Sequence, residues 1–299
     1  MNRLEVDFLN FNLKNPVAAA SGTFGFGKEY AKYYDINQLG AVSLKGLTLN
    51  KKEGNDGVRI WETAGGMLNS IGLENPGVEA FVETYDEIKS RIQTVKIINL
   101  GGDSLDEYIE GARLLNEIDI DILELNISCP NVKSGGMLFG VCEKSAYEVT
   151  RAVKDITRFP LMVKLSPNVT DIAAMAASCQ EAGADALSLI NTVQGMAIDI
   201  QNRRPVFDNI YAGLSGAAIK PIALRMVHQA AKAVDIPIMG IGGIYSAKDV
   251  IEFLMAGARC VQIGTAGFIR PTKLTEILAE LDEYCIENNL SLKEIINIL

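Results

Sequence analysis

The sequence predicts a closed (β/α)8 barrel, also called a TIM barrel, and we expect residues 1–299 to form it as one domain. Short β-branched or apolar runs, typical of buried parallel strands, recur eight times along the chain. Between them lie stretches such as 104–118 and 246–258, with apolar residues at the i, i+3, i+4 spacing of amphipathic helices. A chain of 299 residues with 48% hydrophobic content can bury one large core.

The predicted strands follow one another in order, each with a helical segment behind it. They are residues 16–21, 40–47, 94–102, 121–129, 160–167, 185–192, 236–244 and 260–268. The N-terminal stretch "LEVDFLNFNLKNP" is expected to form a β-hairpin that closes the bottom of the barrel. A doubly wound sheet is the rival fold, but it usually carries a G-x-G-x-x-G turn after its first strand, and none follows residues 16–21.

Composition narrows the class of protein. A net charge of −9 argues against a nucleic-acid partner, because phosphate neutralisation needs clustered Lys and Arg. The N-terminus lacks the continuous apolar stretch of a signal peptide or membrane span, so we expect a cytoplasmic protein with no membrane contact. Five widely spaced cysteines, without a C-x-x-C pair, predict free thiols and no metal site. They are Cys129, Cys142, Cys179, Cys260 and Cys285.

In a barrel of this kind, functional groups gather at the C-terminal ends of the strands. Amides, hydroxyls, two lysines, a thiol and glycines occupy those positions here. They are Ser21, Lys45, Asn99, Asn126, Cys129, Lys164, Asn191, Thr192, Gly242, Gly243, Gly264 and Thr265. Their convergence on one rim predicts a ligand site.

The last two units predict the kind of ligand. "GIGGI" (240–244) and "IGTAGF" (263–268) place glycine-rich loops where barrels commonly bind a phosphate group. We expect the phosphate of flavin mononucleotide (FMN), because a hydride arriving at a flavin leaves negative charge that a nearby cation stabilises. Lys164, at the end of an apolar strand, is the expected cation.

Cys129, in "LNISCPN" (125–131), is the expected general base. An enzyme that moves a hydride from one carbon of a C–C bond must also remove a proton from its neighbour. The only histidine, His228, lies in a predicted surface helix, which leaves the thiol at the rim. The segment 132–140 after it is glycine-hinged with an apolar tip, as expected of an active-site flap.

Several asparagines suggest the substrate ring. Asn69, Asn126, Asn131 and Asn191 each offer a donor and an acceptor, which matches a pyrimidine. The loop 67–75 has a glycine-containing turn that, together with Lys45, is suited to a carboxylate.

Nine ordered motifs that span the chain resemble those of the dihydroorotate dehydrogenases. They are "AAASGTFGFG", "SLKGLT", "MLNSIGLENPG", "NISCPNVKSGG", "VKLSPN", "LINT", "GLSG", "GIGGI" and "IGTAGF". The resemblance implies FMN-dependent oxidation of dihydroorotate to orotate in de novo pyrimidine biosynthesis. It implies that Cys129 is the base at C5, while C6 delivers hydride to FMN.

The resemblance also implies two sets of contacts. Those with FMN are Ser21, Lys45, Gly46, Asn99, Asn126, Lys164, Ile190, Gly216, Gly242, Gly243, Gly264 and Thr265. Those with the substrate are Lys45, Asn69, Ser70, Ile71, Gly72, Leu73, Asn126, Asn191 and Thr192.

Within the family, the chain resembles the NAD-linked catalytic subunit (class 1B). Quinone-linked members use serine as the base and carry an N-terminal extension, whereas this chain has Cys129 and begins close to its first strand. The flap "NVKSGGMLFG" differs from the "NVPGKPQ" typical of fumarate-linked homodimers. The resemblance implies a partner subunit with FAD and a [2Fe-2S] cluster, and a homodimer of this chain within a heterotetramer.

Three alternatives remain open at this point. One is a fumarate-linked homodimer. A dihydropyrimidine dehydrogenase would share the barrel, FMN and the cysteine, but its substrate has no carboxylate for Lys45 to hold. The third is a barrel that binds a phosphate ligand without catalysis.

Overall fold

Residues 2–128 and 139–299 are described by the structure, a computed structural model in which eight parallel strands close into a barrel. The strands, in the order of the chain, are β3 (Val17–Ala19), β4 (Ala41–Ser43), β7 (Val95–Leu100), β8 (Ile122–Asn126), β9 (Leu161–Lys164), β10 (Ala186–Leu189), β15 (Ile238–Ile241) and β16 (Cys260–Ile263). Each pairs with its neighbour along the chain, and β16 pairs with β3 to complete the ring. The predicted (β/α)8 barrel is confirmed, and every predicted strand contains one of these eight.

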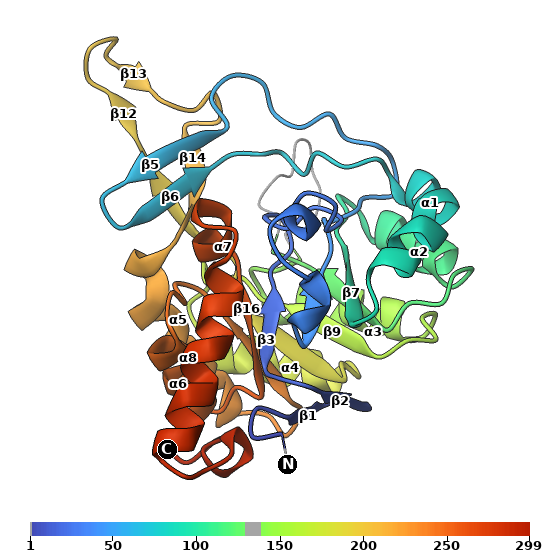
Figure 1. The fold of residues 1–299 in the computed structure, drawn as a ribbon. Helices are drawn as coiled ribbons and strands as arrows, with labels where there is room; N and C mark the ends of the chain where they lie inside the picture. Colours follow the sequence, from blue (N-terminus) through green and yellow to red (C-terminus); the bar gives the residue numbers. More distant parts are fainter. Residues whose placement is uncertain (1, 129–138) are drawn as a thin grey trace.

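The helices pack around the barrel as an outer layer (Figure 1). They are α1 (Val78–Arg91), α2 (Leu105–Leu115), α3 (Glu143–Lys154), α4 (Ile172–Glu181), α5 (Lys220–Ala231), α6 (Ala247–Met255), the short α7 (Thr265–Ile269) and α8 (Lys273–Glu287), with 3-10 turns η1 (Tyr30–Lys32), η2 (Ile36–Gln38), η3 (Ala217–Ile219) and η4 (Leu292–Glu294). Local signals begin several of them: Ser104 caps α2, and Ser246 forms a capping box with Asp249 at α6. None of the helices in the described residues is long and apolar enough to cross a membrane.

The N-terminal hairpin has the predicted place and form. Strands β1 (Val6–Phe8) and β2 (Phe11–Leu13) pair antiparallel through a short turn. Val6, Phe8 and Leu13 are buried in the main core, so the hairpin seals one end of the barrel (Figure 1).

A second sheet, which the sequence did not predict, lies beyond the other end of the barrel (Figure 1). We call it the roof sheet. It is antiparallel, in the order β11 (Val193–Met196), β14 (Tyr211–Ser215), β6 (Gly66–Asn69) and β5 (Ile60–Thr63), and a small hairpin of β12 (Ile198–Asp199) and β13 (Arg204–Pro205) extends from it. The sheet has an apolar cluster of its own, made by Leu68, Val206, Phe207 and Ala212. The stretch 67–75, predicted as a loop with a glycine-containing turn, therefore begins as a strand and leaves the sheet only after Asn69.

Glycines explain both the close packing of the roof sheet and its weak sequence signal. A Cβ on Gly66 would lie 1.9 Å from the carbonyl oxygen of Ser215, and one on Gly213 would lie 2.2 Å from Oγ1 of Thr192. Only glycine allows these strands to approach so closely. Glycines also interrupt the alternation of apolar and polar residues by which a strand is recognised.

The predicted flap falls mainly outside the described residues. Cys129 and residues 130–138 belong to that part of the chain. Of the flap, the structure describes Phe139, which is buried with its ring centroid 5.5 Å from that of Tyr108, and Gly140.

Candidate active site

A cavity of about 770 Å³ lies between the C-terminal ends of the barrel strands and the roof sheet. Its volume is in the range of natural cofactor and ligand sites. Residues from the barrel loops form one part of its wall, while Met67, Gln194 and Tyr211 of the roof sheet form another.

Every predicted site residue that the structure describes lines this one cavity. They are Ser21, Lys45, Gly46, Asn69, Ser70, Ile71, Gly72, Leu73, Asn99, Asn126, Lys164, Ile190, Asn191, Thr192, Gly216, Gly242, Gly243, Gly264 and Thr265. Cys129 lies outside the described residues. Its neighbour Ser128 lines the cavity, as do Gly140 and Val141 beyond the gap. The individual roles of these residues remain predictions.

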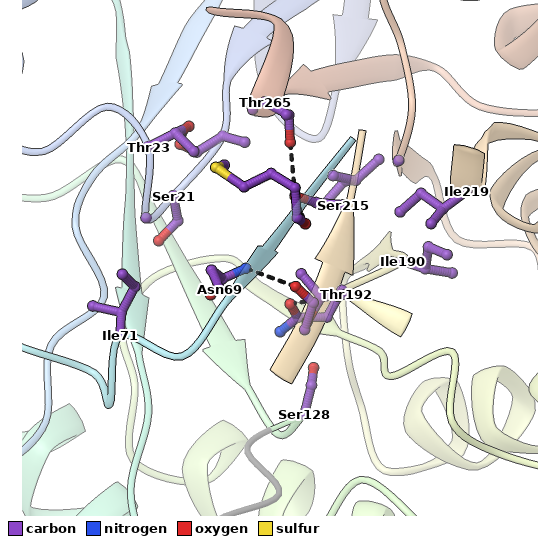
Figure 2. Close-up of a pocket in the computed structure, with 18 of the residues that line it drawn as sticks. Ser21, Thr23, Asn69, Ile71, Ser128, Ile190, Thr192, Ser215, Ile219 and Thr265 are labelled. Atoms are coloured by element: carbon purple, nitrogen blue, oxygen red, sulfur yellow. Dashed lines mark hydrogen bonds between the residues drawn. The ribbon is translucent and has the colours of Figure 1, made fainter. Parts of the chain in front are cut away.

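Glycines form the wall of the cavity below the roof sheet. At Gly243, φ is +74°, and an added Cβ would lie 2.6 Å from the backbone nitrogen of Lys220. At Gly242, an added Cβ would lie 2.7 Å from Cβ of Ala223. Bare backbone is thus held against the start of α5, which suits a phosphate group that backbone amides approach closely. Beside it, the hydroxyl of Thr265 donates to Oγ of Ser215 at 2.9 Å, and Figure 2 shows the two side chains facing one another.

Lys45 brings a cation to the cavity wall. Burial lowers the pKa of its ammonium group, an effect that Glu74 opposes and Arg59 reinforces. Glu74 itself is paired with Arg59. Among the residues that the structure describes, none forms an ion pair with Lys45. A half-buried cation without a counter-ion is suited to an anionic ligand, such as a carboxylate.

Three amides form a chain across the floor of the cavity. Nδ2 of Asn191 donates to Oδ1 of Asn126 at 3.4 Å, and Nδ2 of Asn126 donates to Oδ1 of Asn99 at 3.4 Å. On the roof side, Nδ2 of Asn69 donates to the carbonyl of Gly213 at 3.1 Å. Figure 2 draws this bond as a dashed line from Asn69. Donors and acceptors therefore surround a space in which a heterocycle with alternating C=O and N–H groups can be held.

Lys164 ends β9 beneath this space. It is only 5% exposed, and its Nζ lies 4.0 Å from Oε2 of Glu124, deeper in the barrel. Oγ of Ser128 donates to the backbone carbonyl of Lys164 at 3.0 Å, so the end of β8, next to Cys129, is tied to β9. The cavity, the bare glycine backbone and the buried cation together fit FMN.

Sequence reasoning missed several polar residues that line the cavity. They include Ser166, Asn168, Gln194, Asn209, Tyr211 and Gln262. Gln194 and Tyr211 belong to the roof sheet, which the sequence did not predict. Gln262 was visible as a polar residue inside the apolar run "CVQIG", but both faces of a barrel strand are buried, so the run does not say whether its side chain points into the barrel.

These features define a ligand site of the kind that enzymes build at the C-terminal face of a (β/α)8 barrel, with a glycine wall suited to a phosphate, the buried Lys164 and the half-buried Lys45. The chain belongs to the dihydroorotate dehydrogenase family. The model of that family, described as "Dihydroorotate dehydrogenase", matches residues 3–285. The family predicted from the motifs is confirmed.

Curated relatives cover nearly the whole chain. A protein of Petrotoga mobilis is 53% identical over 290 residues, which are 97% of this chain and 97% of that protein. One of Brachyspira hyodysenteriae is 53% identical over 300 residues, or 99% and 98% of the two chains. One of Thermoanaerobacter pseudethanolicus is 50% identical over 297 residues, again 99% and 98%. All three are named dihydroorotate dehydrogenase B (NAD(+)), catalytic subunit.

Proposed function

We propose that this chain is an FMN-dependent catalytic subunit that oxidises (S)-dihydroorotate to orotate in de novo pyrimidine (UMP) biosynthesis and passes the electrons towards NAD. The observation that carries the proposal is the convergence of every described candidate residue on one cavity. The names of the relatives, which cover almost the whole chain, support the same activity.

FMN, when bound, supplies the hydride acceptor. We assign its phosphate to the glycine wall of Gly216, Gly242, Gly243 and Gly264 with Thr265. Lys164 is suited to hold the flavin edge on which negative charge develops, because its side chain is buried and its ammonium lies at the end of β9 in the cavity wall. The remaining FMN contacts assigned from the family resemblance are Ser21, Lys45, Gly46, Asn99, Asn126 and Ile190.

The substrate's carboxylate is assigned to Lys45 and the loop Asn69 to Leu73. Lys45 has an ammonium group whose pKa is lowered by burial, and an anion restores the charge balance that the site lacks. Asn126 and Asn191, already joined at 3.4 Å, and Thr192 are assigned to the ring's amide groups.

Replacing Lys45 with Met is expected to raise the KM for dihydroorotate by about tenfold to hundredfold, because a charge-assisted hydrogen bond to the carboxylate is lost. Steady-state kinetics measure the effect. Lys52→Met is the matched control: its ammonium pairs with Asp103 at 2.6 Å and does not line the cavity. An unchanged KM for Lys45→Met would contradict the assignment.

We assign the removal of the C5 proton to Cys129. The residue lies outside the described part of the chain, but Ser128 before it and Gly140 after the gap both line the cavity. The position of these two flanking residues on the cavity wall supports the assignment.

The relatives' name, "catalytic subunit", supports a partner subunit, to which we assign FAD and a [2Fe-2S] cluster. We also propose a homodimer of this chain within a heterotetramer, working in the cytoplasm, with residues 1–299 as a single FMN-binding domain. Apolar side chains of the roof sheet and its hairpin support a protein interface, since Trp61 is 44% exposed, Ile198 59% and Ile200 83%.

Anaerobic mixing of the FMN-loaded chain with dihydroorotate tests the activity, and dihydrouracil, which lacks the carboxylate, is the comparison. Dihydroorotate should bleach the flavin absorbance and dihydrouracil should not. The reduced chain should then reduce NAD slowly when alone and rapidly with its partner subunit. A flavin that dihydroorotate leaves oxidised would refute the activity. Rapid NAD or fumarate reduction by the chain alone would refute the partner assignment.

A further inference from the structure

A carboxylate lies inside the barrel, directly below the candidate site. Glu124 of β8 is 0% exposed, and five polar side chains from five other strands surround it. They are Ser43, Asn99, Lys164, Ser188 and Gln262. Glu124 does not itself line the cavity, whereas Asn99, Lys164 and Gln262 do.

The surroundings keep this carboxylate ionised. Burial alone would raise the pKa of Glu124, but the Lys164 ammonium and the donated hydrogen bonds outweigh it and hold the pKa below its ordinary value. Oε1 accepts from Oγ of Ser188 at 2.7 Å and from Nε2 of Gln262 at 2.9 Å. Oε2 accepts from Nδ2 of Asn99 at 2.6 Å and from Oγ of Ser43 at 3.2 Å. All four donors point at the charge.

Stability alone is a weak reason for a buried ion pair. Well-packed apolar side chains of similar volume often stabilise a protein as much or more, because two charges must be removed from water. A barrel interior is ordinarily filled by branched apolar residues. The cluster around Glu124 is therefore better explained by what it does to the residues above it.

The carboxylate fixes the direction of two amides in the cavity wall. Because Nδ2 of Asn99 donates to Glu124, its Oδ1 must face Nδ2 of Asn126, which starts the amide chain of the floor. Because Nε2 of Gln262 donates to Glu124, its Oε1 points elsewhere, and this buried oxygen has no hydrogen-bond partner within the described residues. The same charge lies 4.0 Å from Nζ of Lys164.

We propose that Glu124 is a positioning residue for the redox site. Its carboxylate places the ammonium of Lys164 and orients the amides of Asn99 and Gln262. It also partly neutralises the charge of that ammonium, which faces the negative charge that FMN acquires on reduction. This inference rests on the proposed function, because it requires FMN in the cavity. Glu124 does not line the cavity, so it would act through Lys164, Asn99 and Gln262, which do.

The test measures FMN binding rather than turnover. Dissociation constants of the apoprotein for oxidised and for reduced FMN are determined anaerobically, together with the midpoint potential of the bound cofactor. In Glu124→Gln, Lys164 loses its counter-charge, so reduced FMN should gain affinity over oxidised FMN by about tenfold, and the potential should rise. A potential and an affinity ratio equal to those of the wild type, with only thermal stability lowered, would leave Glu124 a purely structural role and overturn the proposal.

Two further variants sharpen the test. Ser43→Ala removes one hydrogen bond to the same carboxylate but keeps its charge, so its potential should stay at the wild-type value. Glu124→Asp keeps the charge but withdraws it from Lys164 by one methylene, so its potential should rise less than that of Glu124→Gln. If Glu124→Gln does not fold, Glu124→Asp carries the test, and an unshifted potential in that variant overturns the proposal.

The outcomes separate this inference from the proposed function. A wild-type chain that binds no FMN refutes the function and the inference together. A chain that binds FMN and is reduced by dihydroorotate, but whose potential does not respond to Glu124, refutes the inference alone.

Discussion

Cys129→Ala is expected to lower the turnover of dihydroorotate by about 10²- to 10⁴-fold near neutral pH while FMN stays bound, because a positioned general base contributes that much to a proton transfer. The loss should appear in the anaerobic rate of flavin reduction as well as in steady-state turnover. The FMN content of the purified variant, read from its absorbance, shows that the cofactor site is intact.

Cys142→Ala is the control for this prediction. Cys142 is an exposed free thiol near the flap, and hydrogen bonds with the side chain and backbone of Ser145 lower its pKa. It is therefore the described thiol that a general reactivity argument would favour, yet it lies outside the cavity wall. Its replacement should leave turnover within a few fold. Activity that survives in Cys129→Ala and fails in Cys142→Ala would reverse the assignment.

A serine at position 129 refines the prediction. Its hydroxyl gives up a proton less readily than a thiol, so the pH profile of Cys129→Ser should move to higher pH, with activity mainly at the alkaline end. A profile that coincides with that of the wild type would count against proton removal by this residue.

Lys164→Met is expected to lower both the stability of the apoprotein and the rate of flavin reduction, and the two effects can be measured separately. Lys164 is 5% exposed and its ammonium faces the carboxylate of Glu124, a residue that is 0% exposed. Loss of the ammonium therefore leaves a buried charge unpaired and should destabilise the apoprotein by about 3 kcal/mol. Flavin reduction by dihydroorotate should also slow by about 10²-fold, because the cation at the flavin edge is missing. Denaturant unfolding of the apoprotein and stopped-flow reduction of the holoprotein measure the two parts.

Lys96→Met is the matched control for Lys164→Met. Lys96 is also buried, pairs with Asp121 at 2.8 Å, and lies near the start of β7, at the opposite end of the barrel strands from the cavity. It should lower stability without slowing flavin reduction. If flavin reduction by dihydroorotate is equally fast in Lys164→Met and in the wild type, Lys164 has only a structural role.

The barrel was predictable because its strands are buried on both faces and therefore read as continuous apolar runs, with capped amphipathic helices between them. The strand ends followed from the runs, and with them the residues that converge on the cavity. Fold rules alone thus bring together Ser21, Lys45, Asn126 and Lys164, which lie far apart in the sequence.

The roof sheet was not predictable, for a physical reason. Its inner strands carry Gly66 and Gly213 where the neighbouring backbone or side chain leaves no room for a Cβ. These two strands, β6 and β14, pair antiparallel across more than a hundred residues, as with Asn69 and Gly213. A short strand with a distant partner and a glycine in its middle carries no local pattern that specifies it.

Glu124 shows a second limit of prediction from the sequence. The run "DILELNISC" displays a charged residue among apolar ones, but both faces of a barrel strand are buried, so the sequence alone does not tell which way the side chain points. The inward direction became clear only from the donors of five other strands.

The cavity is built from two layers, the roof sheet and the barrel, and these differ in how well they tolerate substitutions. Tyr211 and Met67 belong to the roof sheet, which has an apolar cluster of its own, so we expect a substitution there to disturb the barrel strands little. The polar residues below the cavity, in contrast, come one from each of several barrel strands and are joined through the carboxylate of Glu124. We therefore expect substitutions that change which substrate ring the site accepts to occur in the roof sheet. The residues below the cavity, which set the redox properties of the cofactor, should change less.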